Sequence, residues 1–403
     1  MIGFINRRRT LRYLVSGAMS SALPGCASLE RGAPVPAGRA WEATVLGLAN
    51  ERFYPVHDLK PLEAEFIAAV MRQAHVRGAR SPDELPGWQA LAISGGGEAG
   101  AFGAGLLCGW TEAGTRPDFN LVTGISTGAL TAPFAFLGST RDRELRRVYT
   151  DVSAEQILKA RNLMVALFGD AMADNAPLFG LISGYVNESM LADIARAYDS
   201  GKLLFIATTD LDAQQPVIWN IGAIAKSGHP RSLDTVRRVL LASAAIPGAF
   251  PPTMFDVSVG DERYQEMHVD GGTIAQTFLY PSALTVQRRE RIAAGKPVLS
   301  ANAYVIRNGR LDPDWSGVER RTLNIAGRAI STMIATGGYN DVMNIYKDAV
   351  RDAIGYNLAF IQRDFDAPLP APFDPVYMRA LFEYAYGKAR QGYDWAKKPP
   401  GIA

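Results

Sequence analysis

From residue 88 onward, short apolar runs alternate with longer segments of helical periodicity, and this alternation limits the possible folds more than any other feature. Strands are expected over 88–94, 119–125, 203–209, 215–220, 266–269 and 301–306, and helices between them over 100–113, 127–137 and 233–244. Strands that alternate with helices of this length favour a largely parallel sheet covered by helices on both faces. The chain is therefore predicted to have an α/β fold.

The flanking regions have a different character. Residues 26–45 are rich in Gly, Pro and Ala and are expected to form a tether, and a helix is expected over 61–76. The last ninety residues have helical periodicity over 320–336, 340–354 and 375–390. We therefore divide the chain into four parts, which are a leader (1–25), a tether with a helix (26–87), an α/β domain (88–310) and a helical C-terminal extension (311–403).

The N-terminus has the pattern of a targeting segment. Four arginines lie within the first twelve residues, and the apolar run over 13–25 that follows them is too short to span a bilayer. The sequence Leu23-Pro24-Gly25-Cys26 resembles a bacterial lipoprotein cleavage site, so Cys26 is the predicted site of lipid attachment. The arginines also resemble a twin-arginine export signal. The expected location is the bacterial cell envelope, with a basic tail on a cytoplasmic protein as the alternative.

Charge and cysteine content exclude several classes of function. The net charge is +2, and the chain beyond residue 25 carries 38 basic and 40 acidic residues, so it has no electrostatic footprint for nucleic acid. Cys26 and Cys108 are the only cysteines, so the chain cannot form a disulfide framework or a zinc cluster built from thiolates. Cys108 lies in an apolar run and is expected to be a core thiol.

The pentapeptide Gly124-Ile125-Ser126-Thr127-Gly128 matches the G-x-S-x-G pattern, with an apolar strand before it and an apolar helix after it. This is the arrangement of a nucleophile elbow, in which the serine occupies a strained turn and the glycines remove Cβ atoms that would clash. The N-terminus of the following helix adds partial positive charge where an oxyanion would develop. Ser126 is therefore a candidate nucleophile, although the pattern also fits a serine that only caps a helix.

A glycine-rich loop, Ser94-Gly95-Gly96-Gly97-Glu98-Ala99-Gly100, follows the strand over 88–94 and begins the next helix. Its backbone N–H groups are suited to an anion, either a phosphate or the oxyanion of a tetrahedral intermediate. Its spacing also matches G-x-G-x-x-G, so a Rossmann-like nucleotide site is an alternative. That alternative requires an acidic residue at the end of the second strand, whereas Asp118 precedes this strand. We therefore interpret the loop as an oxyanion loop.

The third motif is His268-Val269-Asp270-Gly271-Gly272, which ends a short strand. The two glycines permit a tight turn that leaves the Asp270 carboxylate at the carboxyl edge of the sheet. An Asp-Gly-Gly sequence alone is most often an ordinary turn. It is informative here because it follows a glycine loop and a serine elbow in that order.

Together the three motifs resemble those of the bacterial patatin-like phospholipases. SGGGEAGAFGAG resembles the oxyanion motif of that family, GISTG its nucleophile motif and HVDGG its base motif. Residues 207–220 also resemble its central strand pair, and ASAAIPGAFPP at 242–252 resembles its SxAxPxxFPP segment. The resemblance covers residues 88–275 and does not extend beyond 310.

This resemblance implies a three-layer α/β/α fold and hydrolysis of acyl esters of lipids by a Ser–Asp dyad. Ser126 would attack the ester carbonyl while Asp270 accepts its proton, and the main-chain N–H groups of Gly95, Gly96 and Gly97 would hold the oxyanion. Because an ordinary aspartate is a weak base for a hydroxyl, partial desolvation is expected to raise the pKa of Asp270. The substrate would be a lipid at a membrane surface.

One residue departs from the family pattern. The family often has Arg or Lys two positions after the third glycine, where this chain has Ala99. This departure puts phosphate-bearing substrates in doubt and favours neutral acyl esters. It also leaves open that the chain is a catalytically weak or inactive envelope lipoprotein that binds acyl chains or a partner.

The four histidines favour a dyad over a triad. His57 and His75 precede the catalytic core, and His229 lies in a turn. His268 is two residues before Asp270 and shares its strand face, but we expect it to be a packed or capping residue. A triad of the α/β-hydrolase order would place its histidine after the acid, and none follows Asp270. The chain has no H-E-x-x-H or comparable ligand set, so no metal or cofactor is expected.

Overall fold

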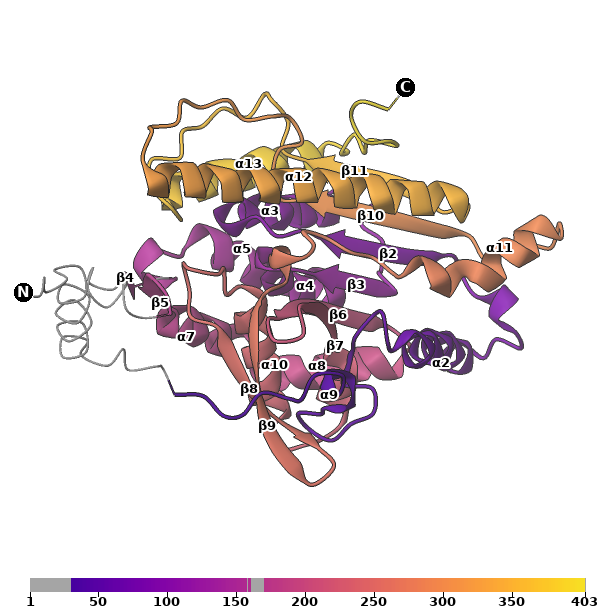
Figure 1. Ribbon diagram of the computed structural model, residues 1–403. Coiled ribbons are helices and arrows are strands. Elements are labelled where there is room, and N and C mark those ends of the chain that lie inside the picture. The colour runs from indigo at the N-terminus through magenta and orange to yellow at the C-terminus, as the bar shows by residue number, and fades with distance from the viewer. Residues whose placement is uncertain (1–29, 158, 161–169, 403) are drawn as a thin grey trace, which may run out of the picture.

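A mixed sheet of nine strands forms the centre of the computed structural model, which describes residues 30–157, 159–160 and 170–402. The strands run in the order β1-β7-β6-β3-β2-β10-β11, and β9 pairs with β6 and with β8 (Figure 1). Their bounds are β1 (Arg52–Phe53), β2 (Trp88–Ile93), β3 (Leu121–Gly124), β6 (Leu203–Asp210), β7 (Gln215–Asn220), β8 (Thr253–Val259), β9 (Glu262–Asp270), β10 (Ala301–Arg307) and β11 (Gly355–Phe360). A separate antiparallel pair is formed by β4 (Lys159–Ala160) and β5 (Ala173–Asp174).

The middle of the sheet is parallel, as the sequence predicts. Strands β6, β3, β2, β10 and β11 all run in the same direction, whereas β1, β7, β8 and β9 form antiparallel pairs. In the register of the parallel strands, Ile93 at the end of β2 lies beside both Gly124 and Ile306. The carboxyl ends of the parallel strands therefore meet along one edge of the sheet, where α/β folds place their sites.

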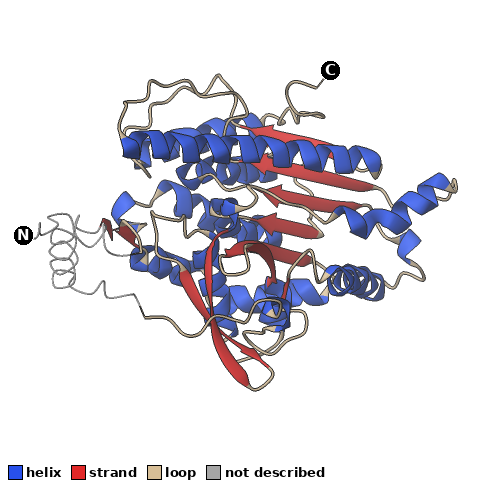
Figure 2. Ribbon diagram, viewed as in Figure 1, coloured by secondary structure: helices blue, strands red, loops and turns tan. Residues whose placement is uncertain are grey.

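Helices cover both faces of the sheet, as Figure 2 shows. Each face of the sheet packs against its own hydrophobic core. Successive residues of β2 point to opposite faces, so Leu91 and Ile93 pack into the first core and Ala90 and Ala92 into the second. The first core includes α3, α4, α10 and α13, and the second includes α2 and α12. The predicted three-layer α/β/α arrangement is confirmed. The helices are α2 (Leu59–Arg77), α3 (Gly100–Glu112), α4 (Thr127–Leu137), α5 (Asp142–Thr150), α7 (Ala176–Tyr185), α8 (Glu188–Asp199), α9 (Ile221–Lys226), α10 (Ser232–Ser243), α11 (Val286–Ala293), α12 (Thr322–Arg351) and α13 (Pro375–Arg390).

The segment over 311–403 differs from the expected helical extension. Its residues 355–360 form β11, which pairs in parallel with β10 and extends the central sheet. A single helix, α12, replaces the two helices predicted over 320–354. Helix α13 packs against α3 so closely that a Cβ atom at Gly105 would lie 2.2 Å from the carbonyl oxygen of Phe382. This segment is therefore an integral part of the layered α/β structure.

The leader predicted over 1–25 and the predicted lipid-attachment residue Cys26 lie outside the described residues. Among the residues that are described, no helix combines the length and apolar character needed to cross a bilayer. Cys108 is buried, as expected.

Candidate active site

The strand topology brings Ser126 and Asp270 together. One edge of β6 is paired with β7, so its other edge is shared by β3 and β9. Strand β3 ends with Gly124 opposite Ile206, and the antiparallel β9 ends with Asp270 opposite Thr208. Two residues of a strand span about 7 Å. The chain turns immediately after Gly124, so the side chain of Ser126 meets the carboxylate of Asp270 in this gap.

Ser126 lies in a strained turn between β3 and α4. Its backbone has φ 55° and ψ −127°, a left-handed conformation that is costly for a residue with a side chain. The flanking positions have no room for a side chain. A Cβ atom at Gly128 would lie 2.2 Å from the carbonyl oxygen of Ile93, and a Cβ atom at Gly124 would lie 2.5 Å from the carbonyl oxygen of Gly128. The strand–turn–helix context predicted for Ser126 is confirmed.

A buried serine holds this turn in place. The backbone N–H of Ser126 donates to Oγ of Ser243 over 3.0 Å, and that hydroxyl donates to the carbonyl oxygen of Ala207 over 2.7 Å. Ser243 is the last residue of α10, so the helix fixes the turn against β6. The role of Ser243 was not predicted, although it lies in the motif-bearing segment over 242–252.

The carboxylate of Asp270 is desolvated beside Ser126. Its residue is 4% exposed, and one carboxylate oxygen accepts a 2.7 Å hydrogen bond from the N–H of Gly272. Burial raises the pKa of Asp270 from its ordinary value of 3.8 to about 7, while the hydrogen bonds from the Ser126 side chain and from Gly272 partly oppose the rise. A carboxylate with a pKa near neutrality is matched to general-base catalysis.

The glycine loop lies against the serine, as expected for an oxyanion loop. A Cβ atom at Gly95 would lie 3.1 Å from Cβ of Ser126. The N–H of Gly95, however, donates to the carbonyl oxygen of Gln276 over 3.0 Å, which corrects the prediction that it holds the oxyanion. The N–H groups of Gly96 and Gly97 donate to no acceptor among the described residues. Both are therefore free to hold an oxyanion, which stays a prediction.

Two residues that the sequence analysis missed clamp this loop from β10. The Arg307 guanidinium donates to the carbonyl oxygen of Gly95 over 3.1 Å and to Oγ of Ser94 over 3.2 Å. The side chain of Asn308 donates to the carbonyl oxygen of Ser94 over 2.8 Å. Both residues stand at the carboxyl end of a predicted strand, and that position is the signal that could have identified them.

No described histidine is hydrogen-bonded to Ser126 or Asp270. His268 is buried, with Nδ1 2.8 Å from Oγ1 of Thr208 and Nε2 3.1 Å from a carboxylate oxygen of Glu266. Its ring packs against the rings of Trp219 and Phe255. His57 stacks on Trp41, and His229 accepts from a backbone N–H. His268 is a packed residue, as expected.

Residues 91–281 match the family model described as patatin-like phospholipase. This match supports the patatin-like phospholipase family for that part of the chain. No curated protein sequence matches the chain. Solved structures with some likeness include VipD from Legionella pneumophila (11% identity, TM-score 0.36) and the human GIVD cytosolic phospholipase A2 (12% identity, TM-score 0.30). The matches cover 76% and 72% of this chain, and only 66% and 51% of those two chains.

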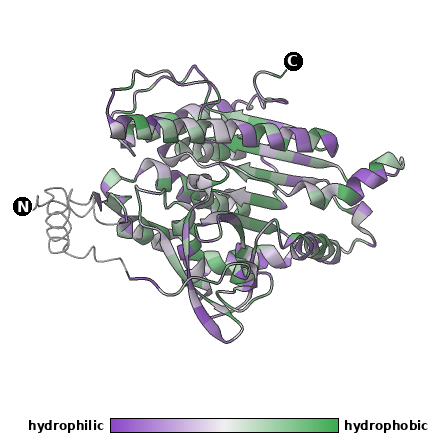
Figure 3. Ribbon diagram, in the orientation of Figure 1, coloured by the Kyte–Doolittle hydropathy of each residue, from purple (hydrophilic) through white to green (hydrophobic). Residues whose placement is uncertain are grey.

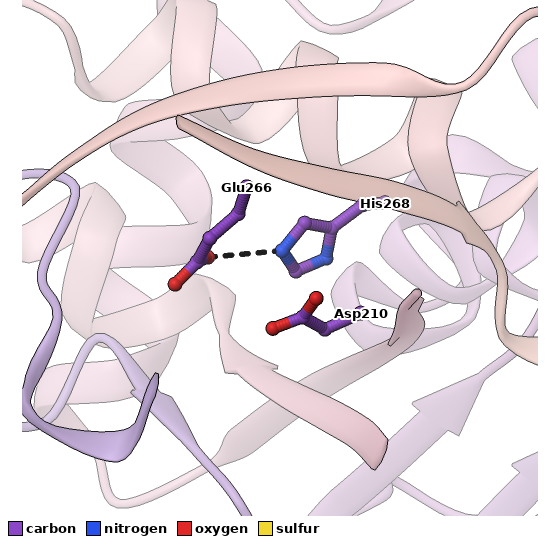
Figure 4. A group of neighbouring side chains, drawn as sticks. All are labelled: Asp210, Glu266 and His268. Atoms are coloured by element: carbon purple, nitrogen blue, oxygen red, sulfur yellow. Dashed lines mark hydrogen bonds and ion pairs between the residues drawn. The ribbon is translucent and has the colours of Figure 1, made fainter. Parts of the chain in front are cut away.

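A second group of titratable side chains lies one strand repeat from Asp270. Figure 4 shows Asp210, Glu266 and His268, whose ligand atoms lie within 4.8 Å of one another. The Arg52 guanidinium donates to both carboxylate oxygens of Glu266, and the Tyr54 hydroxyl donates to Asp210 over 2.9 Å. Arg52 offsets the charge of Glu266, and the ligand atoms of the group are engaged in hydrogen bonds. These partners favour a structural ion pair over a metal site.

An apolar pocket opens beside Ser126, and it draws on segments outside the matched residues. Phe373 and Met378 contribute to its wall from the C-terminal part of the chain. No lysine or arginine occurs among the described residues that line it. Glu98, in the glycine loop next to the pocket residue Gly97, has a pKa that burial raises. The described lining is Gly97, Ser126, Thr127, Leu130, Val148, Tyr149, Ile157, Leu178, Leu181, Ala244, Ile246, Phe250, Phe373 and Met378.

Proposed function

We propose that this chain hydrolyses acyl esters of lipids, with Ser126 as nucleophile and Asp270 as base. The observation that carries the proposal is the buried Asp270 carboxylate, whose pKa is about 7, hydrogen-bonded to a serine in a nucleophile elbow. The match of residues 91–281 to the patatin-like phospholipase model supports a lipid hydrolase in general terms. The specific dyad and substrate are our inference.

In the proposed reaction, Asp270 accepts the hydroxyl proton of Ser126 as Oγ attacks the ester carbonyl carbon. The carbonyl oxygen becomes an oxyanion, which the free N–H groups of Gly96 and Gly97 and the N-terminus of α4 would stabilise. Collapse of this intermediate breaks the ester bond, and the proton on Asp270 passes to the departing alcohol. A water molecule then attacks the acyl-serine, with Asp270 again as base, and releases the fatty acid.

The lining of the pocket favours an acyl chain attached to an uncharged ester. Leu130, Leu181 and Phe250 offer apolar surface to a hydrocarbon. Near the ester the loop presents Glu98 and Ala99, where a basic side chain would be needed to hold a phosphate. A neutral acyl ester is therefore the proposed substrate class, with phospholipids as poorer substrates.

We also propose that the chain acts at the bacterial envelope, held there by a lipid on Cys26. The sequence Leu23-Pro24-Gly25-Cys26 and the arginines that precede it support this location. An anchored enzyme would meet bilayer lipids at a high effective concentration.

A panel of acylglycerols, phospholipids and short-chain aryl esters, incubated with the wild type and with Ser126→Ala, tests the proposal. Fatty acid release should fall by about a thousandfold or more in Ser126→Ala, because the nucleophile is lost. Ser139→Ala, at an exposed serine, is the matched control and should leave the rate unchanged. Turnover that persists in Ser126→Ala would contradict the assignment, and no turnover by the wild type would favour a non-catalytic lipid-binding lipoprotein.

A further inference from the structure

The N-terminal half of α12 projects beyond the body of the protein. The helix ends at Arg351, and after a short turn β11 starts at Gly355, beside Asn302 at the start of β10. A helix of thirty residues is about 45 Å long, whereas a strand of six residues spans about 20 Å. The helix runs back across the strands, so its first turns must extend past their carboxyl ends. Figures 1 and 2 show α12 reaching beyond the arrowheads of β10 and β11.

The point where α12 leaves the body of the protein is marked by its contacts. Gly338 is buried against Arg307 at the carboxyl end of β10, and a Cβ atom there would lie 2.7 Å from Cζ of that arginine. Asp341 accepts a hydrogen bond from the backbone N–H of Gln276, and Val342 belongs to the second core, which also includes α2. The overhang, which we define as residues 322–337, lies on the same edge of the sheet as Ser126.

The overhang carries an exposed apolar stripe. At 100° per residue six apolar side chains fall within about half of the helix circumference, whereas Ala335 lies on the other half. Asn324, Arg328 and Ser331 lie on the other half. Met333 is 73% exposed, and the loop before the helix adds Trp315, which is 90% exposed. Figure 3 shows green, apolar residues along this part of α12. The stripe consists of Ile325, Ala326, Ala329, Ile330, Met333 and Ile334, all of them exposed.

The charges of the overhang suit an anionic surface. Between Arg320 and Asn340 the chain has three arginines and no acidic residue. Arg321 pairs with Glu319 over 3.4 Å and Arg328 with Asp314 over 3.9 Å, and Arg328 also donates to the carbonyl oxygen of Asp314, whereas Arg320 makes no ion pair with a described residue. The helix N-terminus adds partial positive charge at the same end.

We infer that the overhang of α12, together with Trp315, binds the surface of a lipid bilayer and presents the carboxyl edge of the sheet to it. A helix with an apolar stripe, arginines on or beside its polar face and an exposed tryptophan has the features of an interfacial helix. The inference rests on the proposed function in one respect, which is that the substrate of the Ser126 site is a lipid. Binding through the overhang would hold the carboxyl edge of the sheet, where Ser126 lies, at the membrane.

The test uses the full chain with Cys26→Ser, so that lipid attachment does not mask binding. The stripe variant combines Ile330→Ser, Met333→Ser and Ile334→Ser, and the matched control combines Ser331→Ala and Thr332→Ala on the polar side. Co-sedimentation with vesicles of equal parts phosphatidylglycerol and phosphatidylcholine should fall by about tenfold or more in the stripe variant and not in the control. Hydrolysis of an acylglycerol added to such vesicles should fall in parallel, while turnover of a soluble short-chain ester should be unchanged.

Labelling with an environment-sensitive dye gives an independent readout. The remaining thiol, Cys108, is buried, and burial raises its pKa to about 12, so an added surface cysteine can be labelled selectively. A dye at Met333→Cys should shift to the blue when vesicles are added, whereas a dye at Ser331→Cys should not.

The outcomes separate the two proposals. If the stripe variant binds vesicles as well as the wild type, the proposed membrane-binding role of the overhang is wrong, whether or not the enzyme is active. A stripe variant that falls from dimer to monomer in analytical ultracentrifugation also overturns it, since a second copy would then cover the stripe. Absence of soluble-ester turnover in every protein would refute the proposed hydrolase, and the vesicle assay would still decide the role of the overhang.

Discussion

Replacement of Asp270 with asparagine should stabilise the protein at pH 8 while it abolishes activity. Burial raises the pKa of Asp270 from 3.8 to about 7, so between these pH values the folded state keeps a proton that the unfolded chain has released. The unfolded state binds fewer protons in this range, and stability therefore falls as the pH rises. At 1.4 kcal/mol for each pH unit, the ionised carboxylate lowers the free energy of unfolding by at most about 4 kcal/mol above pH 7.

Asparagine has no charge to desolvate, and its amide oxygen can still accept from the N–H of Gly272. The advantage of Asp270→Asn over the wild type should be near zero at pH 4 and grow to its full value by pH 8. Urea unfolding at several pH values measures this difference, and other titrating groups cancel in it. Asp261→Asn, at an exposed aspartate, is the control and should follow the wild type.

The activity of the wild type should rise with pH while its stability falls, because only the ionised Asp270 can accept the proton of Ser126. The rate of soluble-ester hydrolysis should rise through pH 7 and fall about tenfold for each pH unit below it. If Asp270→Asn tracks the wild type in stability from pH 5 to pH 8, or becomes the less stable protein as the pH rises, the carboxylate is not desolvated as described.

Three further perturbations test other parts of the structure. Gly128→Ala should leave little folded protein, since its Cβ would lie 2.2 Å from the carbonyl oxygen of Ile93; near-normal soluble yield and circular dichroism would argue against the elbow geometry. His268→Ala should lower the melting temperature but keep the ester turnover of the folded enzyme within severalfold, and EDTA should not change the rate; a hundredfold loss would make His268 the base. Cys26→Ser should abolish lipid attachment and weaken membrane association to what the overhang of α12 alone supports, and a mature N-terminus elsewhere, found by mass spectrometry, would exclude lipoprotein processing.

Much of the fold could be predicted because apolar runs and helical periodicity are local properties of the sequence. The helices at 127–137 and 375–390 and the strand at 215–220 have the predicted bounds. Other elements depend on tertiary contacts. Separate helices were predicted over 320–336 and 340–354, yet α12 continues through the glycine pair at 337–338, where Gly338 leaves room for the Arg307 side chain.

Strands β8 and β11, two of those that were not predicted, were missed for different reasons. Strand β11 carries Asn357 in a short run between helices, so its place in the sheet depends on pairing with β10. Strand β8 has alternating burial along Thr253–Val259, a period of two that the sequence does contain and that could have identified it.

The residues of the candidate site that lie in sequence motifs were predicted, and those outside the motifs were not. Ser126 and Asp270 come together because each motif lies at a strand end, and because those two strands, β3 and β9, pair with the same edge of β6. The contributions of Arg307 and Asn308 could not be predicted from the motifs, since both act on the glycine loop from a strand more than 200 residues away in the chain. The role of Gly95 was mistaken because the carbonyl group of Gln276 that accepts its N–H lies in an unpatterned turn.

Covalent labelling of the nucleophile tests the central claim most directly. The wild type, Ser126→Ala and Asp270→Asn would each be treated with a fluorophosphonate at pH 8, and the modified peptide would be identified by mass spectrometry. The account predicts a single phosphonylated residue, Ser126, in the wild type, no labelling of Ser126→Ala, and labelling of a folded Asp270→Asn that is slower by about a hundredfold or more, because its base is lost. Rapid labelling of Asp270→Asn, or modification of another serine in the wild type, would contradict it.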